Sequence, residues 1–259
     1  MRGAIIGDII GSVYEFKNPP MKQKDFELFA DNFYTDDSVC TAAVADILLN
    51  GGEPAQVMQK WCRRHPRRGY GGMFREWIDM ENPAPYESYG NGAAMRVSPA
   101  AFLNSGDLTA ALKVAGRVTK ITHNHEEGVR GAEAATHAIW LALNGENPKS
   151  IRDTVAGAYH YDLSQTVDEI RPDYEFDETC QGTVPQAIIC ALKSKSYEDA
   201  VRNAVSLGGD ADTLAAIAGP IAEAMHGIPE NIKQRAEKYL RDAPDINEVM
   251  EKMYKKAGA

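Results

Sequence analysis

Two short acidic clusters lie far apart in this sequence, and their residue types are those that bind hard metal ions. Each cluster holds two aspartates and one threonine, namely Thr35, Asp36 and Asp37 in the first and Asp210, Asp212 and Thr213 in the second. Neighbouring carboxylates repel each other unless a positive charge lies between them, and residues 206–220 contain neither Lys nor Arg. A divalent cation would remove the repulsion, because Mg²⁺, Mn²⁺ and Ca²⁺ favour carboxylate, hydroxyl and water oxygens as ligands.

Helix capping is the simpler explanation for the first cluster, because Thr and Asp are common N-cap residues. It does not account for the second cluster, in which three polar side chains follow Gly208 and Gly209 although one cap needs only one side chain. An EF-hand loop is excluded, since its sixth position would be Ala215 and its twelfth Ile221. The two clusters predict one site shared between two helix N-termini, and four carboxylates suit two metal ions.

The composition is that of a soluble globular protein with a sizeable core. Of the 259 residues, 44% are hydrophobic and 25% are charged. No linker or low-complexity tract divides the chain, so we expect residues 1–259 to form one domain. The 37 acidic residues outnumber the 28 basic ones, for a formal charge of -9. Attraction to nucleic acid or to an anionic membrane is therefore disfavoured.

Targeting and redox signals both favour the cytoplasm. Asp8 interrupts the short apolar run near the N-terminus, unlike in a signal peptide, and no apolar stretch approaches the roughly 18 residues of a membrane span. The cysteines form no CxxC pair, and we expect them to be reduced and buried as small hydrophobic residues: Cys40, Cys62, Cys180 and Cys190.

Almost every segment shows the three- and four-residue spacing of apolar side chains that is typical of helices. We therefore expect an all-α protein whose Ala- and Gly-rich helix faces pack closely around a compact centre. The longest irregular stretch runs from His65 to Asn91; such loops tend to carry function, and a surface excursion without function is the alternative. Helices are predicted between Thr35 and Gly51, and at 53–64, 108–122, 127–143, 150–159, 184–193, 197–206, 213–225, 230–240 and 246–256.

Five short motifs follow one another along nearly the whole chain. They are GAIIGDIIGSVYEF from Gly3, YTDDS from Tyr34, SYGNGAAMRVSP from Ser88, THNHEEG from Thr122 and GGDADTLAAIAG from Gly208. In this order they resemble the ADP-ribosylglycohydrolase family, and five motifs together are far more specific than any one of them. The resemblance implies a compact single-domain orthogonal helical bundle with two Mg²⁺ or Mn²⁺ ions in a central metal cleft, which hydrolyses the bond at C1 of ADP-ribose.

The resemblance also implies roles for individual residues. Glu15 closes the pattern G-D-x-x-G-x-x-x-E and would position or deprotonate the attacking water, with an exposed Glu near a helix end as the ordinary alternative. Asp36 and Asp212 would be essential for catalysis. The metal ligands would be Thr35, Asp36, Asp37, Asp210, Asp212 and Thr213. The substrate contacts would be Ser88, Tyr89, Gly90, Asn91, Gly92 and Arg96 on the diphosphate side, together with His123.

These residue types suit the chemistry. Cleavage at C1 builds positive charge on the ribose, so the sugar must be held while water arrives from one face. Two metal ions about 3.5 to 4 Å apart can grip ribose hydroxyls and lower the pKa of a water. Gly90 and Gly92 let backbone N–H groups approach a phosphate, although a lone G-N-G is more often a plain turn. Tyr89 could stack on adenine, and Tyr86 and Tyr70 are alternative platforms.

Three functions remain open from the sequence. The first is a metal-dependent hydrolase that releases ADP-ribose from a protein side chain, with arginine as the favoured acceptor, or from a small molecule. The second is an inactive ADP-ribose-binding module, which would not need the complete acidic set. The third is a Mg²⁺-dependent phosphohydrolase of the diphosphate. We expect a monomer and acceptor contacts in 65–87 or 162–177. A basic patch is expected to be a solvated face, with contact to an acidic partner as the alternative; it is formed by Arg63, Arg64, Arg67 and Arg68.

Overall fold

The computed structural model describes residues 1–258, and the expected all-α fold is confirmed. These residues contain no β-strand; Gly90 and Thr179 form an isolated antiparallel bridge. In chain order the helices are α1 (Arg2–Gly11), α2 (Asp36–Asn50), α3 (Pro54–Arg64), α4 (Gly72–Asp79), α5 (Gly92–Met95), α6 (Ser98–Leu103), α7 (Leu108–Thr119), α8 (Glu126–Leu143), α9 (Pro148–Tyr159), α10 (Val167–Ile170), α11 (Cys180–Leu192), α12 (Tyr197–Val205), α13 (Ala211–His226), α14 (Glu230–Ala236), the 3-10 helix η1 (Glu237–Leu240) and α15 (Pro244–Ala257).

Helices α1 and α13 lie antiparallel at very close range in the middle of the molecule. Glycine recurs at every fourth position of α1, so one face of this helix carries no side chain. A Cβ added to Gly7 would lie 2.2 Å from the carbonyl oxygen of Ala215, and one added to Gly11 would lie 2.4 Å from Cα of Asp212. No larger residue fits at these positions. The contact sets the C-terminal end of α1 beside the first turn of α13.

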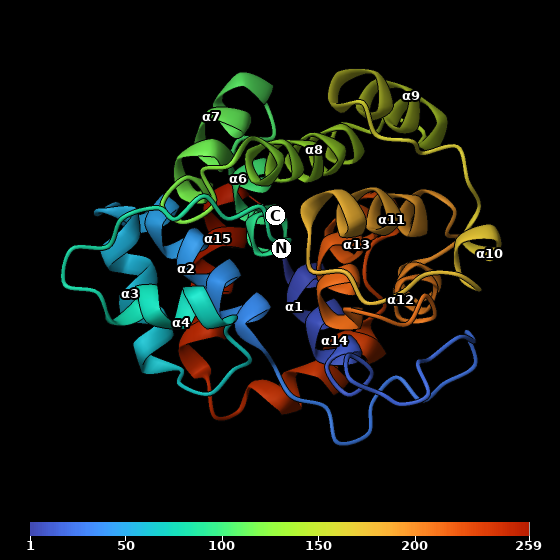
Figure 1. Cartoon of the computed structure of the whole chain (residues 1–259), viewed down its shortest axis with the longest axis horizontal. Coiled ribbons are helices and arrows are strands. Elements are labelled where there is room, and N and C mark those ends of the chain that lie inside the picture. Colours follow the sequence, from blue (N-terminus) through green and yellow to red (C-terminus); the bar gives the residue numbers. More distant parts are fainter. Residues whose placement is uncertain (259) are drawn as a thin grey trace.

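The other helices surround this central pair (Figure 1). Helices α2, α3 and α4 lie on one side and α11 and α12 on the other, while α7, α8 and α9 run along the top of the view. One hydrophobic core extends through all of these layers, from Met1 at the start of the chain to Met253 on α15. Small residues dominate the buried faces, which is consistent with the close packing expected from the Ala- and Gly-rich segments.

The helix prediction needs correction at several places: α1, α6 and α10 were not expected, and two further differences have a clear physical reason. Helix α4 lies inside the stretch 65–91 that the sequence indicated as irregular, because Phe74, Trp77 and Ile78 bury one face of a short helix against the core. The predicted helix 230–240 changes from α-helical to 3-10 geometry after Ala236.

Among the described residues, none of the helices combines the length and the apolar character needed to cross a membrane.

Candidate metal centre and substrate cavity

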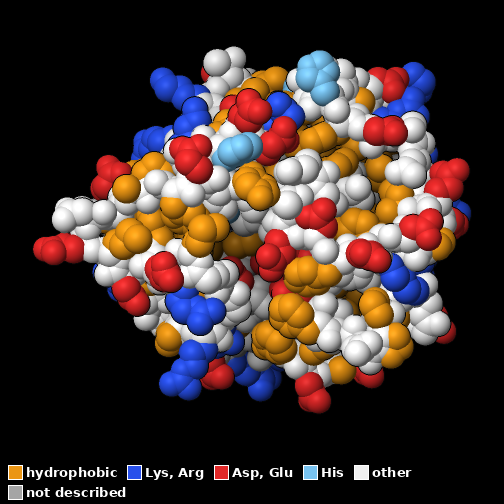
Figure 2. Space-filling model, viewed as in Figure 1, with side chains coloured by type: hydrophobic (Ala, Val, Ile, Leu, Met, Phe, Trp, Pro, Cys, Tyr) orange, Lys and Arg blue, Asp and Glu red, His pale blue; other side chains and the backbone are white. Residues whose placement is uncertain are grey.

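A cavity of about 520 Å³ lies where the end of α1 meets the N-terminal ends of α2, α11 and α13. The structure brings every site residue predicted from the sequence to its wall, although their roles remain predictions. Figure 2 shows acidic side chains at a hollow near the middle of this face, between a group of Lys and Arg side chains and a group of hydrophobic ones. The predicted residues in the wall are Glu15, Thr35, Asp36, Asp37, Ser88, Tyr89, Gly90, Asn91, Gly92, Arg96, His123, Asp210, Asp212 and Thr213.

Carboxylates from distant parts of the chain converge at this cavity. One group consists of Asp8, Asp37 and Asp212, and a second of Glu15, Asp210 and Asp212. Within each group, one carboxylate oxygen of every member lies within 4.8 Å of the others. Because Asp212 belongs to both groups, the two form one continuous acidic cluster.

The first turn of α2 presents Thr35 and Asp37 to this cluster. The Thr35 side chain accepts a hydrogen bond from the backbone N–H of Asp37, so the capping role expected from the sequence is present. The same hydroxyl donates to Oδ1 of Asp8 at 2.7 Å. On the opposite side, the Thr213 hydroxyl donates to Oδ2 of Asp37 at 3.3 Å. Thr35 therefore caps α2 and contacts the carboxylate cluster at the same time.

The turn before α13 depends on two glycines with positive φ. Gly208 has φ 63° and Gly209 has φ 149°, values that side-chain-bearing residues rarely adopt. This turn brings Asp210 to the start of α13, where its Oδ2 accepts a hydrogen bond of 2.6 Å from the side-chain amide of Asn91. The predicted diphosphate loop is thus tied directly to the acidic cluster.

Burial and mutual repulsion raise the pKa of the clustered carboxyl groups. Burial is the largest cause in each case, followed by neighbouring carboxylates for Glu15, whose pKa rises to about 8, and for Asp36, whose pKa rises to about 7. For Asp8, burial raises the pKa to about 6 even though hydrogen bonds from Ser38 and Thr35 oppose the shift. The pKa values of Asp37 and Asp212 lie well above the ordinary range for the same reasons.

This donor set fits a divalent cation. Oδ1 of Asp37 is buried and has no hydrogen-bond partner among the described residues. An unpartnered carboxylate oxygen facing other carboxylates is costly unless a cation binds there. All the grouped ligands are hard oxygen donors, which favours Mg²⁺ or Mn²⁺ over zinc.

Asp36 lines the cavity but belongs to neither group of three carboxylates. Its backbone N–H donates to the carbonyl oxygen of Arg68 at 2.7 Å. A Cβ added to Gly69 would lie 3.3 Å from its Oδ1, so the glycine lets the segment after Arg68 approach this carboxylate closely. Segment 67–72 therefore forms the wall of the cavity beside α2.

The predicted diphosphate loop forms a different wall, because it is bound to the start of α11. The backbone N–H of Asn91 donates to the carbonyl oxygen of Glu178 at 2.7 Å, and that of Cys180 donates to Tyr89 at 2.9 Å. Tyr89 itself is exposed and lies near the His125 ring, with the two ring centroids 5.2 Å apart. It remains available for stacking.

Arg96 has a position that the sequence did not indicate. Only 1% of its surface is exposed, and its guanidinium donates to the carbonyl oxygen of Gly92 and to Nδ1 of His123, the latter at 3.3 Å. Because arginine cannot accept a hydrogen bond, Nδ1 of His123 is the acceptor and Nε2 carries the proton. Burial, and then the Arg96 charge, hold the pKa of His123 well below its ordinary value. His123 is therefore neutral and presents Nε2–H toward the loop of Gly90 and Gly92.

A family model for ADP-ribosylglycohydrolase matches residues 1–259. The chain belongs to the ADP-ribosylglycohydrolase family. Its relatives include ADP-ribosylarginine hydrolase Tri1 of Pseudomonas putida (strain GB-1), which is 25% identical over 98% of this chain and 80% of the relative. ADP-ribosylhydrolase ARH3 of Homo sapiens is 26% identical over 92% of this chain and 88% of the relative.

The fold is also that of a solved structure described as an ADP-ribosylglycohydrolase-related protein complex. That structure aligns with a TM-score of 0.74 at 23% identity and covers 99% of this chain and 95% of that chain. ADP-ribosylglycohydrolases are metal-dependent, and the two carboxylate groups of this chain are able to hold metal ions. Family membership and the named relatives support an ADP-ribosyl hydrolase activity.

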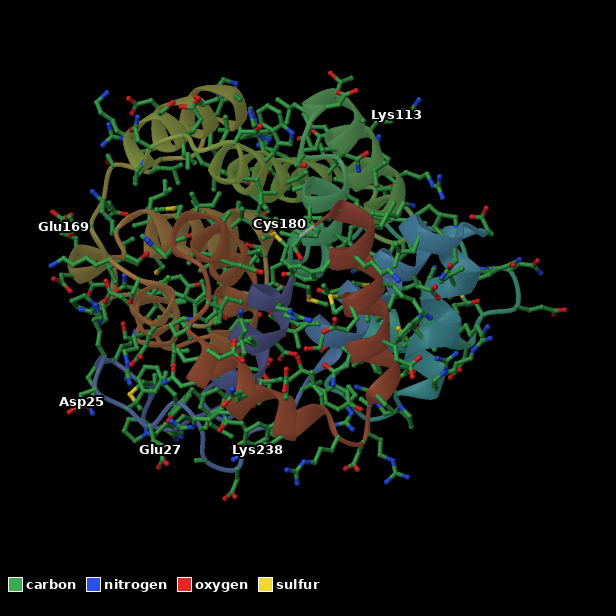
Figure 3. The ribbon with its side chains drawn as sticks, turned by 180° about the vertical axis from the view of Figure 1, so that it is seen from behind. Asp25, Glu27, Lys113, Glu169, Cys180 and Lys238 are labelled. Carbon is green, nitrogen blue, oxygen red and sulfur yellow. The ribbon has the colours of Figure 1, made fainter. Side chains whose placement is uncertain are left out.

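Three residues near the predicted site do not line the ADP-ribosylglycohydrolase cavity. His125 caps α8, where its Nδ1 accepts from the backbone N–H of Glu127, and it takes no part in either carboxylate group. Tyr70 is buried, and its hydroxyl donates to the carbonyl oxygen of His65. Figure 3 shows Cys180 in the interior, where burial raises the pKa of its thiol, as suits a core residue and not a nucleophile.

Asp8 is the member of the acidic cluster that the sequence did not single out. It lies on α1 and is completely buried. Its carboxylate accepts hydrogen bonds from both the backbone and the side chain of Thr35 and of Ser38. The available signal was a charged residue in the middle of the apolar run GAIIGDIIG, because an aspartate there must be buried with partners.

Proposed function

We propose that this chain is a metal-dependent hydrolase that releases ADP-ribose by cleaving the glycosidic bond at ribose C1, with an arginine side chain of a protein as the acceptor. Two Mg²⁺ or Mn²⁺ ions are the proposed cofactors. The observation that carries the proposal is the convergence of Asp8, Asp37 and Asp212 with Glu15 and Asp210 at one cavity. An ADP-ribose-binding module would have no need of so costly an acidic cluster.

Each wall of the cavity has a proposed task. When bound, the metal ions would hold ribose hydroxyls and polarise the attacking water. Asp37, Asp210 and Asp212 would hold these ions, supported by the hydroxyls of Thr35 and Thr213. Asp36 is proposed to take part in catalysis from the adjoining wall of the cavity, beside α2.

Glu15 is the proposed general base. It is half-buried at the cavity, and its pKa is raised to about 8 by burial and then by the neighbouring aspartates. A base works best when its pKa lies near the working pH. Burial keeps the pKa of this carboxylate above that of an ordinary glutamate, while bound cations would offset the share of the shift that comes from the neighbouring aspartates.

The opposite wall would bind the diphosphate. Nε2–H of His123 and the backbone N–H of Gly92 would supply neutral donors to an anion, whereas the N–H groups of Gly90 and Asn91 already donate to Ser88 and Glu178. Arg96 adds a positive charge behind them but is buried and already donates to protein acceptors. Its proposed role is therefore support of the loop and of His123. Tyr89, exposed at the edge of the cavity, would stack on adenine.

An arginine acceptor suits the groups around Glu15. Phe16 offers an aromatic face and Glu178 a second carboxylate, and both line the cavity. A guanidinium is attracted by aromatic faces and by carboxylates. The name of the relative Tri1, an ADP-ribosylarginine hydrolase, supports the same acceptor.

A substrate panel with product analysis tests this function. The protein is incubated with arginine-linked, serine-linked and O-acetyl ADP-ribose substrates, with and without EDTA, and the products are identified by mass spectrometry. We expect free ADP-ribose, released only when metal is present, and near-complete loss of release in Asp36→Ala and Asp212→Ala. Asp25→Ala is the matched control, because Asp25 is exposed and far from the cavity wall.

Other products would reject the proposal. AMP and ribose phosphate would identify a phosphohydrolase of the diphosphate instead. Binding of ADP-ribose without turnover of any substrate would identify an inactive binding module. Release of ADP-ribose that persists after chelation and in both variants would refute the metal-binding roles.

A further inference from the structure

Exposed hydrophobic side chains gather at the mouth of the cavity. Among the described residues, six large hydrophobic side chains are exposed, and four of them line the cavity: Phe16, Phe33, Met73 and Tyr89. A fifth, Phe176, stacks on Phe16 with a centroid distance of 5.8 Å. The sixth, Met80, lies outside this group.

This exposure is large and is not needed for the fold. Phe16 is 77% exposed and Met73 is 61% exposed. Scattered exposed hydrophobic residues are ordinary in soluble proteins, but a group of them around a cavity mouth is typical of an interaction surface. Tyr89 and Phe16 already have proposed roles toward adenine and the acceptor, whereas Phe33 and Met73 have none, and their exposed surface is open to a partner that extends beyond the cavity.

Arginines at the mouth of the cavity carry positive charges that are available for binding. Of the four arginines in segment 63–68, Arg63 pairs with Asp79 at 3.9 Å and Arg64 with Asp245 at 2.8 Å. Neither Arg67 nor Arg68 forms an ion pair among the described residues, and these two are the arginines that line the cavity. Arg63 and Arg64, which form ion pairs, do not line the cavity.

The conformation of these two arginines supports a role in binding. Arg67 is exposed and has φ 62°, the left-handed region that is uncommon for residues other than glycine and is often found at functional sites. The guanidinium carbon of Arg68 lies 3.6 Å from the centroid of the Tyr34 ring, and its Nε is buried without a hydrogen-bond partner. Both residues are held at the mouth with unused donors.

Arg67 and Arg68 lie on a different wall of the cavity from the predicted diphosphate loop. The predicted diphosphate loop is bound to the start of α11 through Glu178, whereas Arg68 is bound to the start of α2 through Asp36. The arginines therefore belong to the wall beside α2, and the exposed hydrophobic residues that line the same cavity include Phe33, Met73 and Phe16, which follows Glu15 in the chain. Both features lie at the opening, where an acceptor would leave the cavity.

We propose that the acceptor is a segment of protein that carries an acidic residue and an apolar residue beside the ADP-ribosylated side chain. The acidic residue binds Arg67, with Arg68 behind it, and the apolar residue packs on Phe33 and Met73. This inference rests on the proposed function and adds the class of acceptor to it. For the basic patch it takes up the acidic partner that the sequence left open, since Arg63 and Arg64 form ion pairs within the chain and Arg67 and Arg68 form none among the described residues.

Three substrates with one linkage test the acceptor class. They are free ADP-ribosylarginine, a peptide with Asp and Leu beside a single ADP-ribosylated arginine, and a peptide with Lys and Ser at the same positions. We expect kcat/KM for the Asp/Leu peptide to exceed that for the other two by about 10-fold, the effect of one or two favourable contacts at the rim of an interface.

Variants of the mouth then assign the effect to residues. Arg67→Glu is expected to lower kcat/KM for the Asp/Leu peptide by about 10-fold and to raise it for the Lys/Ser peptide. Phe33→Ser and Met73→Ser are each expected to lower kcat/KM for the Asp/Leu peptide by about 5-fold. Hydrolysis of free ADP-ribosylarginine should change less than about twofold. Arg117→Glu on α7 and Met80→Ser are matched controls of the same type outside the cavity. Thermal melts confirm that each variant is folded.

Four outcomes would overturn this inference. Equal kcat/KM for all three substrates would show that the enzyme does not recognise the protein segment around the ADP-ribosylated arginine. An equal loss on every substrate in Arg67→Glu, together with weaker inhibition by free ADP-ribose, would place Arg67 on the diphosphate. A dimer in light scattering that Phe33→Ser dissociates would make the hydrophobic group a self-association surface. Equal effects of the control variants would make the changes non-specific. Turnover of free ADP-ribosylarginine reports separately on the proposed function.

Discussion

Asp8 and Thr35 are joined by two hydrogen bonds: the backbone N–H of Thr35 donates to Oδ2 of Asp8 at 3.0 Å, and its hydroxyl donates to Oδ1 at 2.7 Å. A buried aspartate of α1 thereby fixes the first turn of α2, which carries Asp36 and Asp37. The start of the second helix is shaped as much by the first helix as by its own sequence.

The substitution Asp8→Asn tests this support. Asparagine keeps the size of the side chain but replaces one acceptor oxygen by a donor, so only one of the two oxygens that accept from Thr35 and Ser38 remains and the NH₂ group faces a donor. We expect Mg²⁺ or Mn²⁺ affinity to fall by about 10- to 100-fold, as for other residues that orient metal ligands. Isothermal titration calorimetry measures the change. Asp46→Asn on α2, where Asp46 accepts from Trp61, is the control and should bind metal normally.

The stability of the metal-free protein should depend on pH. The folded-state pKa values of Asp8, Asp36 and Glu15 are raised to about 6, 7 and 8, above those of unfolded carboxyl groups. These groups therefore stabilise the fold below about pH 4, and that contribution is lost as the pH rises through the folded values. Melting in EDTA should show Tm falling between pH 5 and pH 8.

Added metal should reverse this loss, because metal binding requires deprotonated ligands. At pH 8 a metal concentration of about 100 times Kd should add about 2.7 kcal/mol, and the gain should be much smaller at pH 5. Differential scanning fluorimetry with and without Mg²⁺ measures both. An equal gain at the two pH values would argue against ion binding at these carboxylates.

The tautomer of His123 is a prediction that NMR can check. Because Arg96 donates to Nδ1, ¹⁵N shifts of the imidazole should show a neutral ring protonated at Nε2 at pH 7. In Arg96→Met the pKa of His123 should rise toward its ordinary value, since the repulsion by the guanidinium is lost while burial, the larger cause, remains. The signal of exposed His160 serves as an internal reference. A charged His123 at pH 7 in the unaltered protein would contradict the assignment.

The close contact of α1 and α13 predicts a strong effect of Gly11→Ala. The added Cβ would lie 2.4 Å from Cα of Asp212, and both atoms belong to helices that cannot shift cheaply. We expect a loss of about 3 kcal/mol or more in urea unfolding, together with weaker metal binding, because Asp212 must move. Gly157→Ala on α9 is the control: no atom lies within 4 Å of its added Cβ, so it should stabilise by about 0.5 to 1 kcal/mol.

Much of the fold followed from local pattern. The helical spacing of apolar residues predicted α2, α3, α7, α8, α9 and α12 to within a few residues, because local signals mark where they start: an N-cap side chain in all but α3, and Pro54 at the start of α3. Helix α4 was not predicted, since its few turns follow Gly71 and become helical only when Phe74 and Trp77 are buried against the core. Short elements depend more on tertiary packing than on propensity.

The sequence by itself determined the ligand chemistry: the acidic clusters at Thr35 and Asp210, their hard oxygen donors and the glycines that precede α13. Only the tertiary structure decided that Asp8 joins them, that Arg96 is buried behind His123, and that Arg67 and Arg68 line the mouth while Arg63 and Arg64 do not. The reason is physical. Residue type and local spacing fix which atoms can bind a cation or an anion, whereas burial, repulsion and pairing depend on neighbours that are distant along the chain.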